Sequence, residues 1–235
     1  LIVIFPLLMP FIVTGTSLCS AIDPMLGKVD IDSLSQQTLM ELLIEGISTQ
    51  QKILGRIKDS ADIEQWKGLF FGEISGDIIK LNWSFCGLEG SVALKWLPRT
   101  LLEVLIAGNK LHGSLDFENL PAALNMLDLA FNRFSGEIFL SKLPDTLEVL
   151  DLMNNRLVGS IDLTNLPKAL QRLLLGSNKL SGEVSLLSLP TGVKYISLAA
   201  NQLSGSLDLS KLPESLKNLY LSRNSFSGYV DLSQL

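Results

Sequence analysis

Three residue types recur through this sequence at a fixed step of 23 residues. Asparagine, proline and glycine keep this step in phase, at Asn109, Asn132, Asn155, Asn178, Asn201 and Asn224, at Pro98, Pro121, Pro144, Pro167, Pro190 and Pro213, and at Gly113, Gly136, Gly159, Gly182, Gly205 and Gly228. A period of roughly 20 to 50 residues is the signature of stacked repeats, in which each unit contacts only its neighbours. The sequence therefore predicts a solenoid with a long exposed surface rather than a closed reaction pocket.

The third unit shows how each repeat is expected to fold. It reads Leu124-x-x-Leu127-x-Leu129-x-x-Asn132-x-Phe134-x-Gly136-x-Ile138-x-Leu140-x-x-Leu143-Pro144. Leu127 and Leu129 are two residues apart, so in a strand both point to one face, and stacked units then form a parallel sheet. We expect the asparagine to bond with backbone groups of its own and the adjacent turn, and the glycine to occupy a turn with positive φ. Ile138 and Leu140 predict a second short extended segment, which Leu-Pro ends at the return corner.

Seven such units fill residues 78–235. They begin at Ile78, Leu101, Leu124, Leu147, Leu170, Val193 and Leu216. The first is degenerate, with Cys86 in the asparagine column, and the last stops at Leu235, where the pattern places a proline. We therefore expect an array that is truncated within a repeat at its C-terminal end. The predicted fold class is an α/β-type repeat solenoid with a curved parallel β-sheet and little helix in the repeats.

Residues 22–77 are predicted to form an N-terminal helix and cap. Ser33 followed by Gln36 fits a helix capping box, and apolar residues at helical spacing predict one helix over about residues 34–58. Residues 59–77 predict a short hairpin or strand that covers the first repeat. The helix either packs on the first repeat or serves as a dimerisation or partner helix, and we favour packing because a solenoid end must be covered.

Residues 1–21 resemble a secretory signal peptide. Residues 1–13 are almost wholly apolar, small and polar residues follow, and Ala21 is a plausible last residue before the cleavage point. The run is short for a membrane span and contains Pro6 and Pro10, which would break a spanning helix. A signal anchor and a buried strand are the alternatives. If the signal is removed, Cys86 is the remaining cysteine, and in an oxidising compartment it must be buried or pair outside this segment.

Composition argues against nucleic-acid binding and against catalysis. The net charge of −5 lacks the basic excess of a nucleic-acid binder. The two cysteines have no metal-ligand spacing, and the single histidine, His112, lies in a turn phrase with no nucleophile placed beside it. We predict no catalytic residues, no metal and no cofactor.

Two minor features of the sequence have both a structural and a functional interpretation. Asp116, Asp162, Asp208 and Asp231 share one column, for which we favour hydrogen bonds to the turn backbone over a ladder of bound cations. Asn82-Trp83-Ser84 is the single N-glycosylation sequon, so Asn82 is the glycosylation candidate if the chain is secreted.

The residues between the repeated leucines point outward, and we expect them to line a concave binding face. This face mixes Tyr, Met, Phe and Arg with few lysines, which is the profile of binding hot spots. Its first half is acidic (Glu103, Asp128, Glu148 and Asp151), and its second half is basic (Arg172, Lys194, Lys217 and Arg223), a polarity that would orient a charged partner. The predicted partner-binding residues are Met126, Asp128, Phe131, Asp151, Met153, Arg172, Tyr195, Tyr220 and Arg223.

The repeat resembles the leucine-rich repeat family, whose pattern is LxxLxLxxNxLxGxI. Phrases such as Leu180-Ser-Gly-Glu-Val184 are similar to the plant-type subclass, and Trp66-Lys-Gly-Leu69 resembles part of plant-type N-terminal caps, although the cysteine pair of those caps is missing. The 23-residue step with its IDLxxLP phrase is more similar to repeats of protist surface and secreted proteins, including those of trypanosomatids.

This resemblance implies a non-catalytic module, secreted or at the cell surface, that binds a protein or peptide along the concave face. Two alternatives remain open. The chain could be a structural or adhesive surface protein, with the array as a stiff spacer. It could also be the ectodomain of a receptor whose other domains, such as a kinase, lie beyond Leu235, which would also provide attachment to a membrane.

Overall fold

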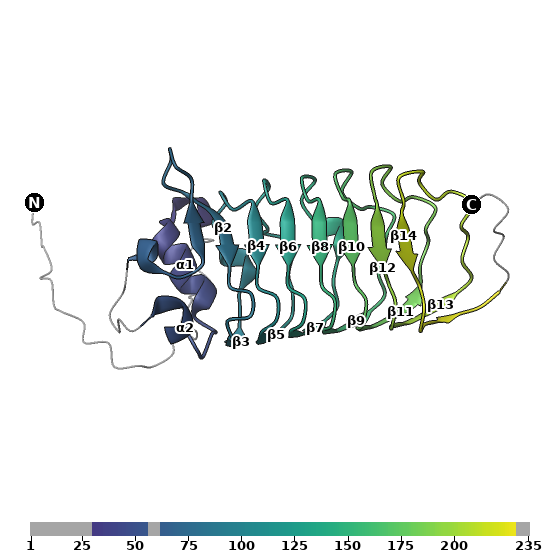
Figure 1. Ribbon diagram of the computed structural model, residues 1–235, viewed down its shortest axis with the longest axis horizontal. Coiled ribbons are helices and arrows are strands. Elements are labelled where there is room, and N and C mark those ends of the chain that lie inside the picture. The colour runs from purple at the N-terminus through teal and green to yellow at the C-terminus, as the bar shows by residue number, and fades with distance from the viewer. Residues whose placement is uncertain (1–29, 56–61, 229–235) are drawn as a thin grey trace, which may run out of the picture. The chain divides into compact units, whose positions relative to one another are not determined.

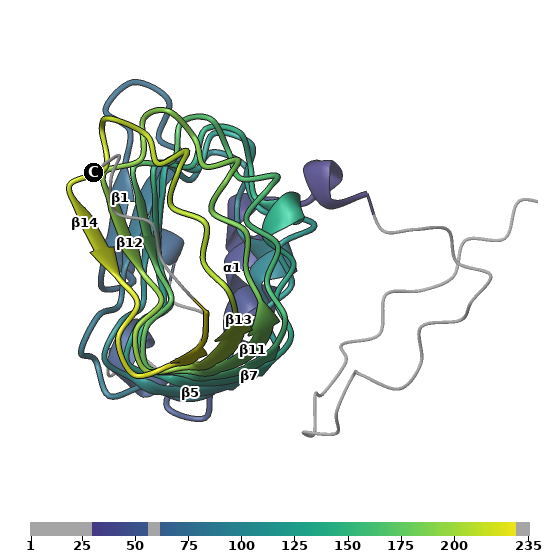
Figure 2. The same cartoon turned by 90° about the vertical axis from the view of Figure 1, so that its right-hand side faces the viewer.

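Each repeat unit contributes one strand to each of two β-sheets that run along the array (Figure 1). The computed structural model describes residues 30–55 and 62–228, and residues from 32 onward belong to one compact unit. The larger sheet has eight strands in the order β1-β2-β4-β6-β8-β10-β12-β14, and the smaller has seven, from β3 to β15. Figure 2, a view along the array, shows the two sheets on different sides of each coil. The leucine-rich repeat solenoid predicted from the sequence is therefore confirmed.

The strands of the repeats are short and evenly spaced in the sequence. Those of the larger sheet are β2 (Ile78–Asn82), β4 (Glu103–Leu105), β6 (Met126–Asp128), β8 (Val149–Asp151), β10 (Arg172–Leu174), β12 (Tyr195–Ser197) and β14 (Asn218–Tyr220). Those of the smaller sheet are β3 (Glu89–Ser91), β5 (Lys110–Gly113), β7 (Arg133–Gly136), β9 (Arg156–Gly159), β11 (Lys179–Glu183), β13 (Gln202–Gly205) and β15 (Ser225–Phe226).

The leucine columns form the core between the two sheets. Strands β2 to β14 pair in parallel with a register shift of one whole repeat, so that Leu127 lies beside Leu150 and Leu150 beside Leu173. Each of these side chains is fully buried, as is Leu129 on the same side of its strand. The alternation of the repeat thus places its leucines inside and the residues between them outside.

The second extended segment lies earlier in the repeat than the sequence pattern predicted. In the third unit it is β7, Arg133–Gly136, directly after Asn132, whereas Leu140–Lys142 forms the 3-10 helix η5. A similar turn, η4, spans Leu94–Trp96 in the first unit. Leu140 is nevertheless buried, because a 3-10 turn can also direct apolar side chains inward, and Ile138 is buried in the irregular segment before this turn. Burial of an apolar residue therefore did not indicate a strand at this position.

The asparagine column forms a ladder of buried hydrogen bonds between successive coils. Asn155 donates through Nδ2 to the carbonyls of Leu129 (3.0 Å) in the preceding coil and Leu152 (3.1 Å) in its own coil. Its Oδ1 accepts a hydrogen bond from the Phe134 amide at 3.0 Å. The other five asparagines make the corresponding contacts, at Asn109, Asn132, Asn178, Asn201 and Asn224. One side chain per coil thus satisfies backbone groups that the turn would leave without partners.

The prediction of one helix over residues 34–58 is wrong. Helix α1 spans Gln36–Ile44 and α2 spans Gln51–Leu54. Between them Ile47 forms an antiparallel bridge with Gly90 of β3, so this segment pairs with the first repeat instead of continuing as a helix. Residues 56–58 lie outside the described residues.

The predicted capping box is also wrong, since Ser35 caps α1 by accepting a hydrogen bond from the Thr38 amide at 3.1 Å. Ser33 belongs to the 3-10 helix η2, Ile31–Ser33. Gln36 turns away from the helix end: its Nε2 donates to Asp77 at 2.9 Å and its Oε1 accepts from the Ile78 amide at 2.7 Å. A tertiary contact therefore replaces the local one that the sequence pattern indicated.

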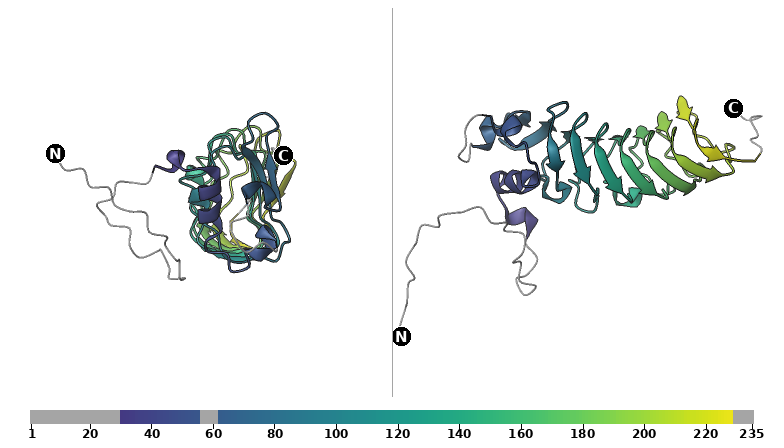
Figure 3. Two further views of the ribbon diagram at one scale, coloured as in Figure 1. Left: turned by 90° about the vertical axis from the view of Figure 1, so that its left-hand side faces the viewer. Right: turned by 90° about the horizontal axis from the view of Figure 1, so that it is seen from below.

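The N-terminal segment covers the end of the array in two places. Figure 3 shows α1 at this end, where Leu39, Met40, Leu43 and Ile44 are buried. The second contact follows the 3-10 helix η3 (Ile63–Gln65). Strand β1, Leu69–Phe71, pairs antiparallel with β2 of the first repeat, so the described part of residues 59–77 forms the strand alternative of the prediction and not a hairpin of its own. Packing of the predicted helix on the first repeat, the alternative we favoured, is what the structure has.

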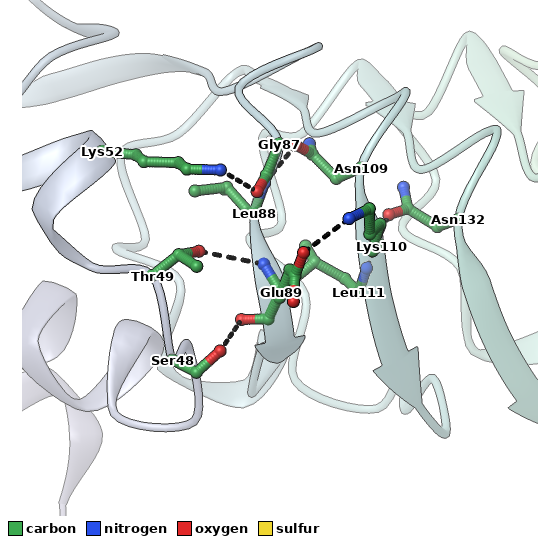
Figure 4. Close-up of polar contacts among 10 residues, drawn as sticks. All are labelled: Ser48, Thr49, Lys52, Gly87, Leu88, Glu89, Asn109, Lys110, Leu111 and Asn132. Atoms are coloured by element: carbon green, nitrogen blue, oxygen red, sulfur yellow. Dashed lines mark hydrogen bonds and ion pairs between the residues drawn. The ribbon is translucent and has the colours of Figure 1, made fainter.

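Polar residues of α2 and the loop before it bond with the exposed edge of β3 (Figure 4). Thr49 accepts a hydrogen bond from the Glu89 amide at 3.0 Å, and Ser48 donates to the Glu89 carbonyl at 3.1 Å. Lys52 donates to the carbonyl of Gly87. These groups occupy the place that a preceding coil would have, so the cap attaches to the first repeat without a cysteine pair.

Several sequence predictions fall outside the described residues. They concern the signal peptide of residues 1–21, Cys19 within it, and Asp231. Cys86 is described and is exposed rather than buried. No helix in the described ranges is both long and apolar enough to cross a membrane.

Candidate functional site

The outward side of the eight-stranded sheet, which we call the concave face, collects side chains from all seven repeats. They stand in three rows that cross the strands. The register of the sheet sets these rows: Lys80, Glu103, Met126, Val149, Arg172, Tyr195 and Asn218; Asn82, Leu105, Asp128, Asp151, Leu174, Ser197 and Tyr220; Ser84, Ala107, Ala130, Met153, Gly176, Ala199 and Ser222. The first two rows mix side chains of different size and charge, and the third is uncharged and small apart from Met153, whereas the leucine columns on the other side of the sheet are uniform.

Four of the predicted residues lie together at the centre of this face. Met126 and Asp128 are on β6, Asp151 ends the neighbouring β8, and Met153 follows it, all of them half-buried. Asp128 and Asp151 are direct register partners. Each accepts one hydrogen bond from a backbone amide two residues further on, at 3.1 Å for Asp128 and 3.0 Å for Asp151. Two adjacent carboxylates thus share an otherwise apolar part of the sheet.

The environment of these two carboxyl groups favours their neutral form. Burial raises the pKa of Asp151 to about 6, against a smaller opposing effect of the backbone hydrogen bond from Met153. The charge of Asp128 raises the pKa of Asp151 further, and the Arg172 charge lowers it. Burial also raises the pKa of Asp128. The folded protein therefore holds protons here that an unfolded chain would release.

We expect the free energy of unfolding to fall as the pH rises from about 4.5 to about 7. An unfolded aspartate has a pKa of about 3.9, so the folded state binds more protons than the unfolded state throughout this window. The change should be roughly 1 kcal/mol, because solvent screens these half-buried groups. The pKa values of Asp162 and Asp208 are lowered by hydrogen bonds from Thr164 and Ser210, so these two groups make the free energy of unfolding rise with pH, at lower pH than this window.

Urea unfolding at several pH values measures this dependence. Asp151→Asn should flatten the curve and exceed the wild type in stability at neutral pH. A wild-type curve that rises between about pH 4.5 and pH 7 would contradict this assignment.

Arg172, Tyr195 and Tyr220 form the second group of predicted residues. The Arg172 guanidinium lies 5.1 Å from the centre of the Tyr195 ring, a cation–π distance. Tyr220 is 52% exposed, and its hydroxyl accepts a hydrogen bond from Asn218 at 3.1 Å. Two aromatic rings thus lie on the C-terminal part of the face, one of them beneath a cation.

Phe131 and Arg223 lie at the edge of the face, in the turn that follows the strands. Both have positive φ, 54° and 57°, as does the residue before the asparagine position in every repeat. Asparagine and glycine adopt this conformation more readily than phenylalanine. Phe131 is 54% exposed, so an apolar ring stands in solvent on a backbone that does not favour it. The structure separates Phe131 from Arg223 by three intervening repeats, and they do not form one cluster.

The charge polarity of the face is less simple than the sequence suggested. Glu103 forms an ion pair with Lys80, at 2.6 Å, and is thereby neutralised locally. Beside the three rows, Gln171 donates to Glu148 at 2.9 Å and accepts from Lys194 at 2.7 Å, linking the acidic and basic halves across three repeats. The unpaired acidic charge is therefore concentrated at the two central aspartates.

Phe70 is a face residue that the sequence analysis missed. It is 49% exposed on β1, opposite Lys80, whose ammonium lies 5.9 Å from the ring centre. Because β1 lies outside the repeats, no column marks its outward positions. The short hairpin or strand predicted over residues 59–77 was the available signal, but its register could not be read from the sequence.

The remaining predicted sites lie elsewhere or stay untested. In the aspartate column, Asp116, Asp162 and Asp208 each accept a hydrogen bond from a backbone amide two residues on, as we favoured. In the described ranges no group of three or more His, Cys, Asp or Glu side chains is placed to hold a metal ion. Asn82 is exposed on β2 within the concave face, and its glycosylation stays a prediction.

No family model matches the sequence, and no curated protein matches it. Among solved structures, pollen receptor kinase 3 is 23% identical with a TM-score of 0.63, and the match covers 82% of this chain and 96% of that chain. PEPR1, in its structure with AtPEP1, is 24% identical with a TM-score of 0.60, over 83% of this chain and 32% of that chain.

A third match is the BIR3–SERK2 complex from Arabidopsis thaliana. It is 25% identical with a TM-score of 0.48, and the match covers 81% of this chain and 94% of that chain. The first two matches agree with the repeat register in assigning the fold. The chain therefore has the leucine-rich repeat solenoid fold that is found in plant receptor kinases.

Proposed function

We propose that this protein is an extracellular recognition module whose concave face binds a protein or peptide without catalysing a reaction. One observation carries the proposal. The side chains that face the core repeat almost unchanged, whereas those on the concave face differ from strand to strand and include Met126, Arg172, Tyr195 and Tyr220. Scaffold packing does not require this variety, and aromatic, Met and Arg side chains are enriched where interfaces form.

The solved structures support the same function by analogy of fold. PEPR1 was crystallised with AtPEP1, and BIR3 with SERK2, so solenoids of this kind are found in complexes. The receptor-ectodomain alternative follows from the same likeness to receptor kinases. An adhesive spacer is the remaining alternative, and self-association of the purified chain would favour it. The finer resemblance to protist surface proteins stays a prediction.

Charge reversal on the face tests this function. A variant with Asp128→Lys, Asp151→Lys, Arg172→Glu and Lys217→Glu keeps the net charge and alters both halves of the face. Peptides selected by the wild-type chain from a displayed random nonapeptide library should bind this variant at least about 100-fold more weakly, because several charged contacts are reversed at once. Affinity is measured by calorimetry.

The control variant reverses four charges on or beside the seven-stranded sheet instead. It carries Glu137→Lys, Glu183→Lys, Arg133→Glu and Lys179→Glu, all at exposed positions, and again keeps the net charge. It should bind the selected peptides like the wild type. Equal affinity of wild type and face variant, or an equal loss in both variants, would contradict binding through the concave face.

A further inference from the structure

The centre of the concave face combines two carboxylates with an apolar floor. Asp128 and Asp151 are neighbours in register on β6 and β8. Around them in the three rows stand half-buried apolar side chains, namely Leu105, Met126, Val149, Met153 and Leu174. Ordinary surface aspartates are surrounded by water or by cations, and here much of that water is replaced by hydrocarbon.

No cation in the part of the chain that the structure describes lies at contact distance from these two carboxylates. The ion pairs within residues 30–55 and 62–228 involve neither aspartate. Arg172, one strand away on β10, influences Asp151 only at longer range and lies over the Tyr195 ring. Each carboxylate uses one oxygen for its backbone hydrogen bond. The other oxygen of each has no donor within residues 30–55 and 62–228 and can accept a hydrogen bond from a ligand.

We propose that Asp128 and Asp151 form a subsite for an arginine side chain of an extended peptide or protein segment bound along the concave face. This inference rests on the proposed function and names the chemistry of the ligand at one place. Adjacent strands are about 4.8 Å apart, and a guanidinium with its several N–H donors can reach carboxylates on both. The apolar floor accommodates the aliphatic stem of the arginine, as such stems bury readily beneath a charged head.

Arginine fits this subsite better than lysine does. Its planar fork donates to two acceptors at once and loses less hydration on partial burial than an ammonium. An anionic segment is excluded from the centre by the two carboxylates, although Arg172 and Lys217 could still meet acidic residues further along the face. The subsite thus predicts the order of charges along the array, with a basic ligand residue at β6–β8 and any acidic ones further towards β10 and β14.

Binding at this subsite is coupled to protonation. The charged groups on the strands beside Asp151 are Asp128 on β6 and Arg172 on β10. Since the pKa of Asp151 is raised to about 6, an arginine must displace a proton when it binds under mildly acidic conditions. The affinity of an arginine-containing peptide should therefore rise between about pH 5 and about pH 7.5.

A random nonapeptide library displayed on phage tests the inference, with the whole chain as bait. Peptides recovered by the wild type should be enriched in arginine at one position. The paired substitution Asp128→Asn and Asp151→Asn keeps the side-chain shape and the backbone hydrogen bonds. It should lower the affinity for these peptides at least about tenfold and abolish the pH dependence of that affinity. The matched control, Glu137→Gln with Glu183→Gln, removes the same charge from exposed positions outside the face and should leave affinity unchanged.

The outcomes separate this inference from the proposed function. Selected peptides that lack arginine enrichment, yet lose affinity in the four-residue charge-reversal variant, would overturn the arginine subsite and leave the binding face intact. Equal affinity of arginine peptides for wild type and the Asn pair would also overturn the subsite. Recovery of no binding peptide at all would count against both. A thermal melt of the Asn pair, expected to be at least as stable as the wild type at neutral pH, confirms that it is folded.

Discussion

Replacing Asn155 with alanine is expected to lower the free energy of unfolding by roughly 3–5 kcal/mol. The side chain is buried and joins two adjacent coils through the Leu129 carbonyl and the Phe134 amide of the preceding coil and the Leu152 carbonyl of its own coil. Alanine offers no partner to any of these groups, and each buried group left unsatisfied costs about 1–3 kcal/mol. The neighbouring coils cannot compensate, because their own asparagines are already engaged.

Amide hydrogen exchange together with urea unfolding measures this effect. The Phe134 amide should exchange much faster in Asn155→Ala, while amides in β2 and β4 keep their protection, since each coil contacts only its neighbours. The control is Asn165→Ala, which removes an exposed asparagine that donates only to Asp162 and Thr164, within the same turn, among the described residues. A loss of less than about 1 kcal/mol in Asn155→Ala would show that the ladder contributes little to stability.

Gly90→Ala is expected to detach the N-terminal cap from the first repeat. Gly90 has a φ of +107°, and a Cβ at this position would overlap the carbonyl oxygen of Gly46 in the loop between α1 and α2. The same oxygen accepts a hydrogen bond from the Ser91 amide at 2.8 Å, and the Ser48 amide donates to Glu89 at 2.9 Å, so these contacts would be lost together. We expect a loss of at least about 3 kcal/mol from backbone strain and the broken contacts.

Gly113→Ala isolates the contribution of the close approach. Gly113 has nearly the same φ, +106°, but its nearest neighbour would be the Ser91 Cβ at 3.8 Å, an ordinary contact distance. This variant should lose only about 1–2 kcal/mol, from the strained backbone alone. Exchange of the Ser48 amide reports on cap attachment and should accelerate in Gly90→Ala and not in Gly113→Ala. Equal effects of the two substitutions would mean that the cap does not depend on this contact.

The repeated positions were predictable because each one meets the same surroundings in every coil. Asn155, Leu150 and Gly159 recur at the same step and occupy equivalent places, so a single physical argument holds for every member of a column. A leucine faces its counterparts in the neighbouring coils, and a buried asparagine always has the same two turns to bond. The fold could therefore be derived from the period and elementary chemistry.

The cap was less predictable because its contacts join segments that are distant in the sequence. Ser33 and Gln36 have the local spacing of a capping box, yet Gln36 bonds with Asp77 and Ile78, and Ser35 caps the helix. The helical pattern likewise ends where Ile47 pairs with Gly90. Local propensity was overridden in each case by a tertiary hydrogen bond, which the sequence alone does not display.

The concave face was predictable in position and not in its charge balance. Alternation placed Asp128, Asp151 and Arg172 outward, as the structure has them. Whether a charged residue is paired depends on its neighbour in the next coil: Glu103 meets Lys80, whereas Asp128 meets Asp151. The consequences of that arrangement, a raised pKa and a free carboxylate pair, became visible only when burial was known.

Hydroxyl-radical footprinting of the complex with a selected peptide tests the central claim most directly. Met, Tyr and Phe side chains react readily with such radicals, and the face carries all three at Met126, Met153, Tyr195 and Tyr220, with Phe131 at its edge. Phe139 is 62% exposed and lies outside the face rows, so it serves as the internal reference. Bound peptide should protect Met126, Met153 and Tyr195 and leave Phe139 unchanged. Protection of Phe139 with unaltered oxidation of the face residues would contradict binding through the concave face.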